Sequence, residues 1–134
     1  MIVELFTSEG CSSCPLADQL LSRLEKEQPA AGVEIIALGE HVDYWNRLGW
    51  EDPYSSPQFS RRQMQYAQAF RIEAAYTPQL VIDGRVELLG SDARRAPIAI
   101  IAAARTPKAG VELRCWQDPA GAGCSTTPSS AGSP

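Results

Sequence analysis

The sequence predicts an α/β fold in three layers, with helices on both faces of a mixed central sheet of about four strands. In the first half of the chain, two short β-rich runs enclose a helical stripe of leucines. In the second half, two further runs flank an Asp-Gly pair, and another apolar helix follows them. The first arrangement is typical of parallel strands joined by a crossover helix, and the second of a β-hairpin.

The first unit consists of two strands and one helix. Residues 2–6 and 33–38 are β-rich runs that suit strands buried on both faces. Pro15 suits the first turn of the intervening helix, and Pro29 with Gly32 ends it. The apolar stripe of this helix consists of Leu16, Leu20, Leu21 and Leu24. The connection is long enough to join the two strands in parallel.

The middle of the chain is a polar and aromatic stretch, residues 41–57, followed by a second helix. Ser56 and Pro57 are typical of an N-cap and of the first helical residue. The helix presents a mostly apolar face at helical spacing, made of Phe59, Gln63, Tyr66, Ala67 and Phe70. Four aromatic residues of the stretch either line a groove near the first two cysteines or pack the loop itself: Tyr44, Trp45, Trp50 and Tyr54.

The second half is predicted to form a hairpin and a last helix. Residues 79–82 and 86–89 flank Asp83-Gly84-Arg85, a pattern typical of a tight hairpin turn. Ser91 and Asp92 can cap the helix that follows, whose apolar body is residues 98–104. The resulting order, β-α-β-α-β-β-α, is that of the thioredoxin fold.

The C-terminal end differs in composition from the rest of the 134-residue chain. Residues 111–116 are either one more strand or part of a tail. Residues 117–134 are mostly Pro, Ala, Gly, Ser and Thr, whose small side chains cannot offset the entropy of ordering. We therefore expect a thioredoxin-like domain over residues 1–116 and a disordered tail over residues 117–134.

Composition excludes several classes of function. The net charge of -4 argues against a nucleic-acid partner, which would need a basic face. The longest apolar run, residues 97–104, is far shorter than the roughly 20 residues of a membrane span. A single His excludes a multi-His metal site, and we expect neither a metal nor a cofactor. The start of the chain lacks the features of a signal peptide, which leaves a cytoplasmic protein or a mature secreted form.

The motif that carries chemistry is Cys11-Ser12-Ser13-Cys14, placed between the first strand and the first helix. A thiolate at this point faces unpaired backbone N–H groups and the positive end of the helix dipole. Both stabilise the thiolate, so the pKa of the Cys11 thiol is expected to fall below its free value of about 8.5. Cys11 is the predicted nucleophile, and Cys14, one turn into the helix, would resolve the mixed disulfide.

Two other roles for these cysteines stay open. The Cys11–Cys14 bond could be a permanent structural disulfide, or the pair could bind zinc together with Cys115 and Cys124. The spacing of the second pair matches a zinc ribbon poorly. A small loop disulfide, or two free thiols, fits Cys115 and Cys124 better.

Five further residues are considered for roles at the site. Given the cysteine pair, Pro78 is predicted to follow a cis peptide bond, so that the backbone of Thr77 could pair with an extended substrate. Glu4 lies within an apolar strand, where a buried carboxyl group could exchange a proton with Cys14; a solvent-exposed strand edge explains it equally well. Asp18 is a weaker candidate for the same role. His41, in the predicted loop, fits a surface or hydrogen-bonded structural residue better than a catalytic one.

Several separated motifs resemble, in the same order, a bacterial family of thioredoxin-like proteins of unknown function, many of them periplasmic or secreted. These motifs are VELFTSEGCSSCP at residues 3–15, VDYW at 42–45, LGW at 48–50, DPYSSP at 52–57, YTPQ at 76–79 and Asp83-Gly84. The resemblance covers about residues 2–105. It implies a thioredoxin-like fold, a CxxC pair at Cys11 and Cys14, a cis-proline at Pro78 and a periplasmic or secreted location.

Together these features predict a thiol–disulfide oxidoreductase-like domain with a redox-active centre at Cys11 and Cys14. Its partners would be protein or small-molecule thiols and disulfides, with no nucleic acid and no membrane span. The alternative is a non-catalytic binding or structural module whose Cys11–Cys14 disulfide stays closed.

Overall fold

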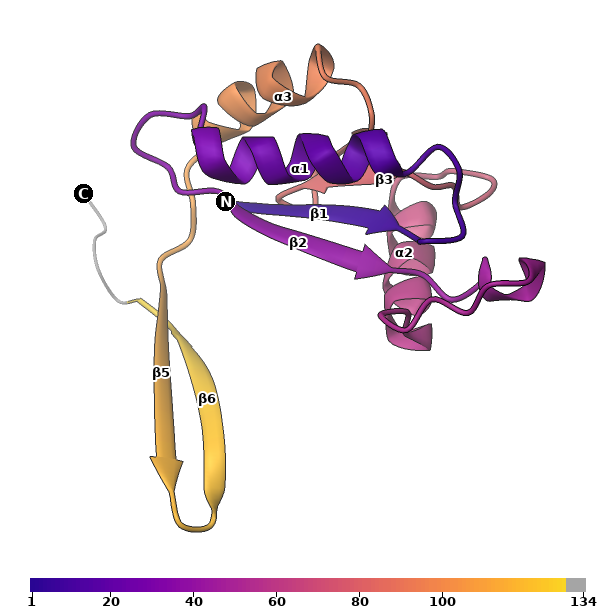
Figure 1. Ribbon diagram of the computed structural model, residues 1–134. Coiled ribbons are helices and arrows are strands. Elements are labelled where there is room, and N and C mark those ends of the chain that lie inside the picture. Colours follow the sequence, from indigo (N-terminus) through magenta and orange to yellow (C-terminus); the bar gives the residue numbers. More distant parts are fainter. Residues whose placement is uncertain (130–134) are drawn as a thin grey trace.

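The computed structural model describes residues 1–129 and contains a mixed sheet of four strands in the order β2-β1-β3-β4 (Figure 1). β1 pairs in parallel with β2 and antiparallel with β3, and β3 pairs antiparallel with β4. The elements are β1 (Ile2–Thr7), α1 (Pro15–Glu27), β2 (Ile36–His41), the short 3-10 helix η1 (Asn46–Leu48), α2 (Pro57–Ala69), β3 (Gln79–Ile82), β4 (Val86–Leu89), α3 (Arg95–Ala104), β5 (Val111–Asp118) and β6 (Gly121–Pro128). The predicted α/β class is confirmed, and the architecture is compatible with a thioredoxin-like fold.

Two apolar clusters hold helices against opposite faces of the sheet. Successive side chains of a strand point to opposite faces. Leu5 therefore belongs to the cluster that includes Leu24 of α1 and Ile100 of α3. Phe6, the next residue, belongs to the smaller cluster against which Tyr66 and Phe70 pack, at α2. The result is the predicted arrangement of three layers, with α1 and α3 on one face and α2 on the other (Figure 1).

Helix α1 starts and ends as its sequence predicts, with one difference in its buried face. Cys14 is the N-cap and Pro15 the first helical residue. Leu20, Leu21 and Leu24 are buried, as predicted. Leu16, the first leucine of the predicted stripe, is instead 68% exposed.

Strand β2 is shifted from its prediction of residues 33–38 and begins at Ile36. The side-chain amide of Gln28 forms two hydrogen bonds with the backbone of Ile35. It accepts the N–H of Ile35 at 2.7 Å and donates to its carbonyl at 3.1 Å. The chain before Ile36 is therefore bonded to the end of α1. The expected burial on both faces is also wrong for this strand, because β2 is an edge strand with Ile36 and Leu38 exposed.

The predicted helix cap, hairpin turn and last helix are confirmed. The Ser56 hydroxyl accepts the backbone N–H of Gln58 at 3.2 Å at the start of α2. Asp83 and Gly84 take the left-handed backbone conformation that a tight turn between β3 and β4 requires, with φ of 50° and 66°. The Asp92 carboxylate accepts two backbone N–H groups at the start of α3.

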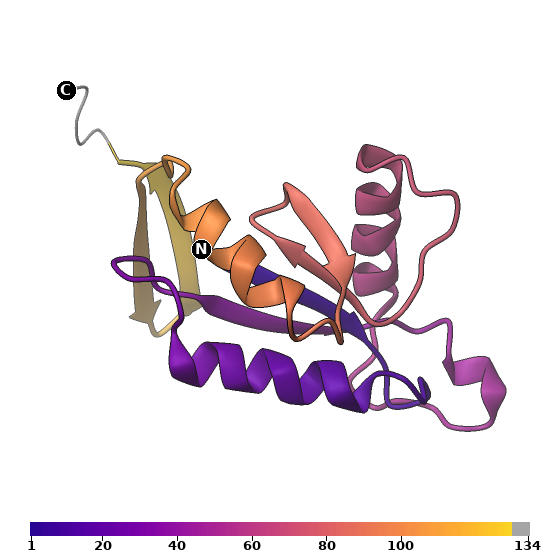
Figure 2. The same ribbon diagram turned by 90° about the horizontal axis from the view of Figure 1, so that it is seen from above.

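The C-terminal segment differs from the prediction that residues 117–134 lack order. β5 and β6 form a separate two-stranded sheet that projects from the domain (Figures 1 and 2). Cys115 lies opposite Cys124 in the ladder and is joined to it by a disulfide. Composition alone underestimated the order here, because a cross-link and ladder hydrogen bonds replace the missing apolar core. Residues 130–134 of the predicted tail lie outside the described residues.

Within residues 1–129, no helix has both the length and the apolar character needed to cross a bilayer.

Candidate functional site

Cys11 and Cys14 form a disulfide in the turn between β1 and α1, with their Cα atoms 5.4 Å apart. The turn is closed by backbone hydrogen bonds. The N–H of Cys11 donates to the carbonyl of Ser8 at 3.1 Å, and the N–H of Cys14 donates to the carbonyl of Cys11 at 3.2 Å. Because Cys14 is the N-cap of α1, the disulfide stands at the N-terminus of a 13-residue helix, as predicted. The predicted place of Cys14 one turn into the helix is wrong, because the helix begins only at Pro15.

The surroundings of the disulfide suit a thiolate. Cys14 makes no side-chain hydrogen bond to the helix it caps, and the first N–H groups of a helix have no partner within it. The sulfur of Cys11 lies 3.5 Å from the hydroxyl oxygen of Ser13. Cys11 is 2% exposed and Cys14 is fully buried, while Ser12 and Ser13 between them face solvent. The N–H groups of the first helical turn and the Ser13 hydroxyl can therefore stabilise a negative charge on sulfur.

The Thr77–Pro78 peptide bond is cis, as predicted. One side chain connects this segment with the cysteine turn. The indole N–H of Trp45 donates to the Thr77 hydroxyl at 2.8 Å. Trp45 also packs against Gly10, the residue before Cys11. A Cβ placed on Gly10 would lie 3.2 Å from the Cβ of Trp45. Trp45 therefore packs against both the Thr77 segment and the start of the cysteine turn.

Asp52, which was not among the predicted site residues, ties the long loop to the cysteine turn. It is 2% exposed, and its carboxylate accepts the backbone N–H groups of Glu9 and Tyr54, each at 2.9 Å. The third partner is His41, whose Nδ1 lies 2.6 Å from the same carboxylate. Burial acts to raise the pKa of Asp52, but the hydrogen bonds from Glu9, His41 and Tyr54 outweigh it and lower that pKa below its usual value. An Asp side chain that accepts the backbone N–H of the second residue after it forms a common turn. The sequence Asp52-Pro53-Tyr54 is typical of such a turn.

His41 is hydrogen-bonded and half-buried, in line with the structural role that the sequence favours. It is the last residue of β2 and lies opposite Thr7, the last residue of β1, in the parallel ladder. Its ring centroid is 5.6 Å from that of Tyr54. His41 and Asp52 therefore fix the loop at the same edge of the sheet from which the cysteine turn leaves β1.

The four aromatic residues of the loop divide into two groups. Trp45 and Tyr44 are tied inward, Tyr44 through a hydrogen bond from its hydroxyl to Gln63 at 2.9 Å. Trp50 and Tyr54 point outward and are 59% and 68% exposed. The indole N–H of Trp50 donates to the Glu9 carboxylate at 2.8 Å, two residues before Cys11. Packing of the loop, one of the two predicted roles, thus applies to Tyr44 and Trp45, and a groove lined by these aromatic residues stays a prediction.

Glu4 is buried, at 1% exposure, and contacts the helix on the α2 face of the sheet. Its carboxylate forms an ion pair with Arg62 and accepts a hydrogen bond from the Tyr66 hydroxyl. Cys14 stands at the start of α1, which packs on the opposite face. The structure therefore groups Glu4 with Arg62 and Tyr66, and its proposed proton exchange with Cys14 stays a prediction.

Glu40 is a second buried carboxyl group that the sequence did not mark as a site residue. It is 7% exposed, and one of its oxygens lies 3.6 Å from Nε of Arg62. Within the described residues, its other oxygen is buried without a hydrogen-bond partner. Burial, together with the nearby charge of Glu4, raises the pKa of Glu40 to about 7. Glu40 therefore titrates near neutral pH in a cluster on the α2 face.

Asp18 is the carboxyl group placed on the same face as the cysteine pair. Its backbone N–H donates to the carbonyl of Cys14 at 3.0 Å, which is the first bond of the helix. Its carboxylate accepts the hydroxyl of Thr7 at 2.7 Å. Asp18 thus connects the first turn of α1 to the end of β1.

The four cysteines form two separate disulfides rather than one cluster. Cys115 and Cys124 lie in the projecting hairpin, at the far end of the fold from the cysteine turn (Figure 1). Across residues 1–129, no three or more His, Cys, Asp and Glu side chains come together in a way that could hold a metal ion.

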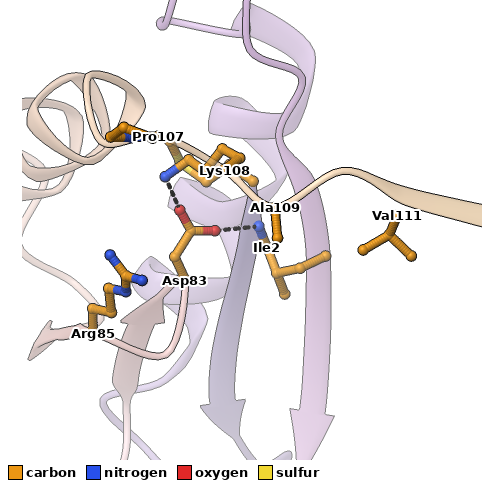
Figure 3. A pocket seen from close by; sticks show the side chains of 8 residues that line it. Ile2, Asp83, Arg85, Pro107, Lys108, Ala109 and Val111 are labelled. Carbon is orange, nitrogen blue, oxygen red and sulfur yellow. Dashed lines mark hydrogen bonds and ion pairs between the residues drawn. The ribbon is translucent and has the colours of Figure 1, made fainter. Parts of the chain in front are cut away.

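A cavity of about 440 Å³ lies at the start of β1 rather than at its cysteine end (Figure 3). The Asp83 carboxylate in its wall accepts the backbone N–H of Ile2 at 2.9 Å and forms an ion pair with Lys108. Burial acts to raise the pKa of Asp83, but Lys108 and the Ile2 N–H lower it below its usual value. This cavity therefore does not include the cysteine pair.

A family model and a solved structure both match most of this chain. A model of the family described as "Protein of unknown function (DUF1223)" matches residues 2–131, a longer stretch than the predicted resemblance over residues 2–105. The X-ray structure of an Agrobacterium tumefaciens protein is similar, with 36% sequence identity and a TM-score of 0.73 over 86% of this chain. The match covers 50% of that solved chain, so the present chain spans half its length. No curated protein matches the sequence.

Proposed function

The chain belongs to the DUF1223 family, and for it we propose thiol–disulfide exchange at the Cys11–Cys14 pair. The observation that carries this proposal is the position of the disulfide. Cys14 caps a 13-residue helix without using its side chain as a cap, and Cys11 lies just outside the helix. Unpaired helix N–H groups and the helix dipole would stabilise a thiolate there, which favours both attack by Cys11 and its departure.

The proposed exchange starts from the disulfide form. A substrate thiolate attacks the sulfur of Cys11, the Cys11–Cys14 bond breaks, and Cys14 leaves as a thiolate. A second substrate thiolate then attacks the substrate sulfur and releases Cys11. Two electrons pass from the substrate dithiol to the protein, and the two substrate protons go to the cysteine thiolates or to water. In the reverse direction Cys11 attacks a substrate disulfide and Cys14 resolves the mixed disulfide.

Thr77 and Pro78 are proposed to hold the substrate backbone. The Thr77 side chain is already held by Trp45, which also packs beside the cysteine turn. This leaves the backbone of Thr77 as the group that would pair with an extended substrate segment.

The proposal is tested by turnover of insulin disulfides with dithiothreitol as the reductant. Wild-type protein is expected to accelerate insulin reduction, and Cys11→Ser and Cys14→Ser to abolish the acceleration. A Cys115→Ser/Cys124→Ser variant is the matched control and should keep wild-type turnover, because it retains the disulfide at α1. Wild-type turnover no greater than that of the Cys11→Ser and Cys14→Ser variants would contradict the proposal.

The second candidate is a binding or structural module with a permanent disulfide. The burial of both Cys11 and Cys14 favours it. The reduction potential of the pair separates the two functions, because structural disulfides typically have potentials below about -300 mV.

We also propose a periplasmic or secreted location. Two disulfides among the described residues support it, since such bonds persist mainly in oxidising compartments.

A further inference from the structure

Four large apolar side chains are exposed on the two segments that are joined to the cysteine turn, the first turn of α1 and the loop after β2. We call them the apolar rim: Leu16, Leu48, Trp50 and Tyr54, exposed by 68%, 73%, 59% and 68%. These two segments lie far apart in the sequence. Exposed apolar side chains that gather around one feature often mark an interaction site, whereas scattered ones need no explanation.

Each segment of the rim is tied to the cysteine pair by a short connection. Leu16 follows Cys14 by two residues. Trp50 is hydrogen-bonded to Glu9, which precedes Cys11 by two residues. Tyr54 packs on His41 at the end of β2, and its backbone N–H is held by Asp52, which also holds the backbone of Glu9.

Between Asn46 and Ser55, the loop that carries most of the rim is braced by polar contacts within itself. The Asn46 side chain accepts the backbone N–H of Asp52 at 3.1 Å and donates to the Ser55 hydroxyl at 2.9 Å. The Ser55 hydroxyl in turn donates to the Asp52 carbonyl at 2.8 Å. These polar contacts hold the backbone in one shape while the apolar side chains stay outside. A surface that is already formed binds with a smaller ordering cost than a disordered loop would.

Charged side chains close to Trp50 are mainly acidic, whereas Arg23 lies near Leu16. Glu9 and Glu51 are exposed carboxylates, and Arg47 is the only Lys or Arg between residues 41 and 56. Aromatic faces and nearby carboxylates both attract a cationic side chain. Basic side chains therefore suit the partner of this surface better than acidic ones.

We propose that the apolar rim binds an extended cysteine-containing polypeptide whose flanking residues are large and apolar, with a basic residue nearby. This inference rests on the proposed exchange at Cys11 and Cys14 and names its substrate class. Large apolar side chains of the substrate cover Trp50, Tyr54, Leu48 and Leu16, while its backbone meets Thr77. The bonds made and broken are those of the exchange described above.

The test measures single-turnover oxidation of reduced dithiol peptides by the disulfide form of the full chain. Three peptides share the two cysteines and differ in their flanks: Leu, Phe and Arg in the first, Leu, Phe and Glu in the second, and Gly and Ser in the third. Dithiothreitol is the small dithiol reference. The reaction is quenched with acid, and the thiols are alkylated and counted by mass spectrometry.

The Leu/Phe/Arg peptide is expected to react at least about tenfold faster than the Gly/Ser peptide, because burying one large apolar side chain supplies that factor. The Leu/Phe/Glu peptide should fall between them, and its difference from the Arg peptide should shrink as salt rises. Trp50→Ser and Tyr54→Ser are each expected to reduce the ratio of peptide rate to dithiothreitol rate. Leu113→Ser, at an exposed position of β5, should leave that ratio unchanged and is the matched control.

The possible failures are distinguishable. Equal rates for the three peptides, in the wild type and in both rim variants, would overturn the rim as a substrate site while exchange itself stands. No reaction with the peptides or with dithiothreitol would overturn the proposed function and this inference together. Thermal unfolding of each variant verifies that the fold is intact.

Discussion

Glu40 shows at the residue scale how burial changes the chemistry of one carboxyl group. It lies on the edge strand β2, beside the ion pair of Glu4 and Arg62, with one oxygen lacking a hydrogen-bond partner among the described residues. Burial first, and then the charge of Glu4, raises its pKa from 4.5 to about 7, against the opposing effect of Arg62. Between pH 4.5 and about 7, Glu40 therefore keeps its proton in the folded chain and loses it in the unfolded chain.

The sign of the pH dependence follows from this pKa. The contribution of Glu40 to stability is largest below pH 4.5, falls as the pH rises to about 7, and then stays level. The full change is at most about 3 kcal/mol. Asp52 and Asp83, whose pKa values are lowered, titrate below this range. We expect Glu40→Gln to flatten the dependence of the unfolding free energy on pH between 5 and 7, as measured by urea denaturation.

The control for this prediction is Glu25→Gln, which changes an exposed carboxyl group on α1 and should keep the wild-type slope. A Glu40→Gln protein with an unchanged slope between pH 5 and 7 would show that another group is responsible.

Gly90 is a second residue at which neighbouring packing decides what is tolerated. A Cβ at this position would stand 2.7 Å from the Leu5 side chain, closer than such atoms approach, and 3.0 Å from the Cβ of Pro78, which is a tight contact. Gly90→Ala is expected to destabilise the fold by about 1–3 kcal/mol, the usual cost of overpacking. Chemical denaturation measures this.

Gly39→Ala is the matched control for Gly90→Ala. Gly39 lies in β2 and has open space around the corresponding position. Because the added methyl group meets nothing there, its effect on stability should be small. Similar losses for the two variants would contradict the packing explanation.

At the scale of elements, the β5–β6 hairpin is held differently from the rest of the fold. Nearly all of its side chains are exposed, including Val111, Leu113 and Trp116. An isolated two-stranded hairpin is marginally stable in water. The Cys115–Cys124 disulfide and the ladder hydrogen bonds are therefore its main stabilising contacts.

Removing this disulfide is expected to disorder the hairpin and leave the domain folded. A cross-link over so short a loop contributes about 2–3 kcal/mol by reducing the entropy of the open chain. In a Cys115→Ser/Cys124→Ser variant, amide hydrogen exchange should become fast over residues 111–128 and stay slow in β1, β3 and α1. Unchanged protection of the hairpin would mean that the ladder alone suffices.

Elements also differ in how far local sequence predicts them. α1, α2 and the β3–β4 hairpin follow from their caps, apolar spacing and Asp-Gly turn, which are local features. The start of β2 does not, because the Gln28 side chain competes for the backbone of Ile35 across a seven-residue gap. β6 was missed because its order depends on a cross-link rather than on apolar side chains.

At the scale of the whole molecule, one edge of the sheet gathers the groups proposed to act together. β1 and β2 run in parallel, so their last residues, Thr7 and His41, end side by side. The cysteine turn follows the first of these strands and the braced loop follows the second. The cavity beside Asp83 and the projecting hairpin lie toward the other end, near Met1 (Figures 1 and 3).

The sequence by itself determined the α/β class, the place of Cys11 and Cys14 at a strand–helix junction, and the candidate Thr77–Pro78 segment. These follow from apolar periodicity, helix capping and motif spacing, all of which act over a few residues. The tertiary structure decided which distant side chains meet. It directed Glu4 to Arg62 on the α2 face, buried Glu40 beside them, and joined Asp52 to Glu9. Such contacts depend on which face of a strand a residue occupies and on what packs there, and neighbouring residues in the sequence do not specify this.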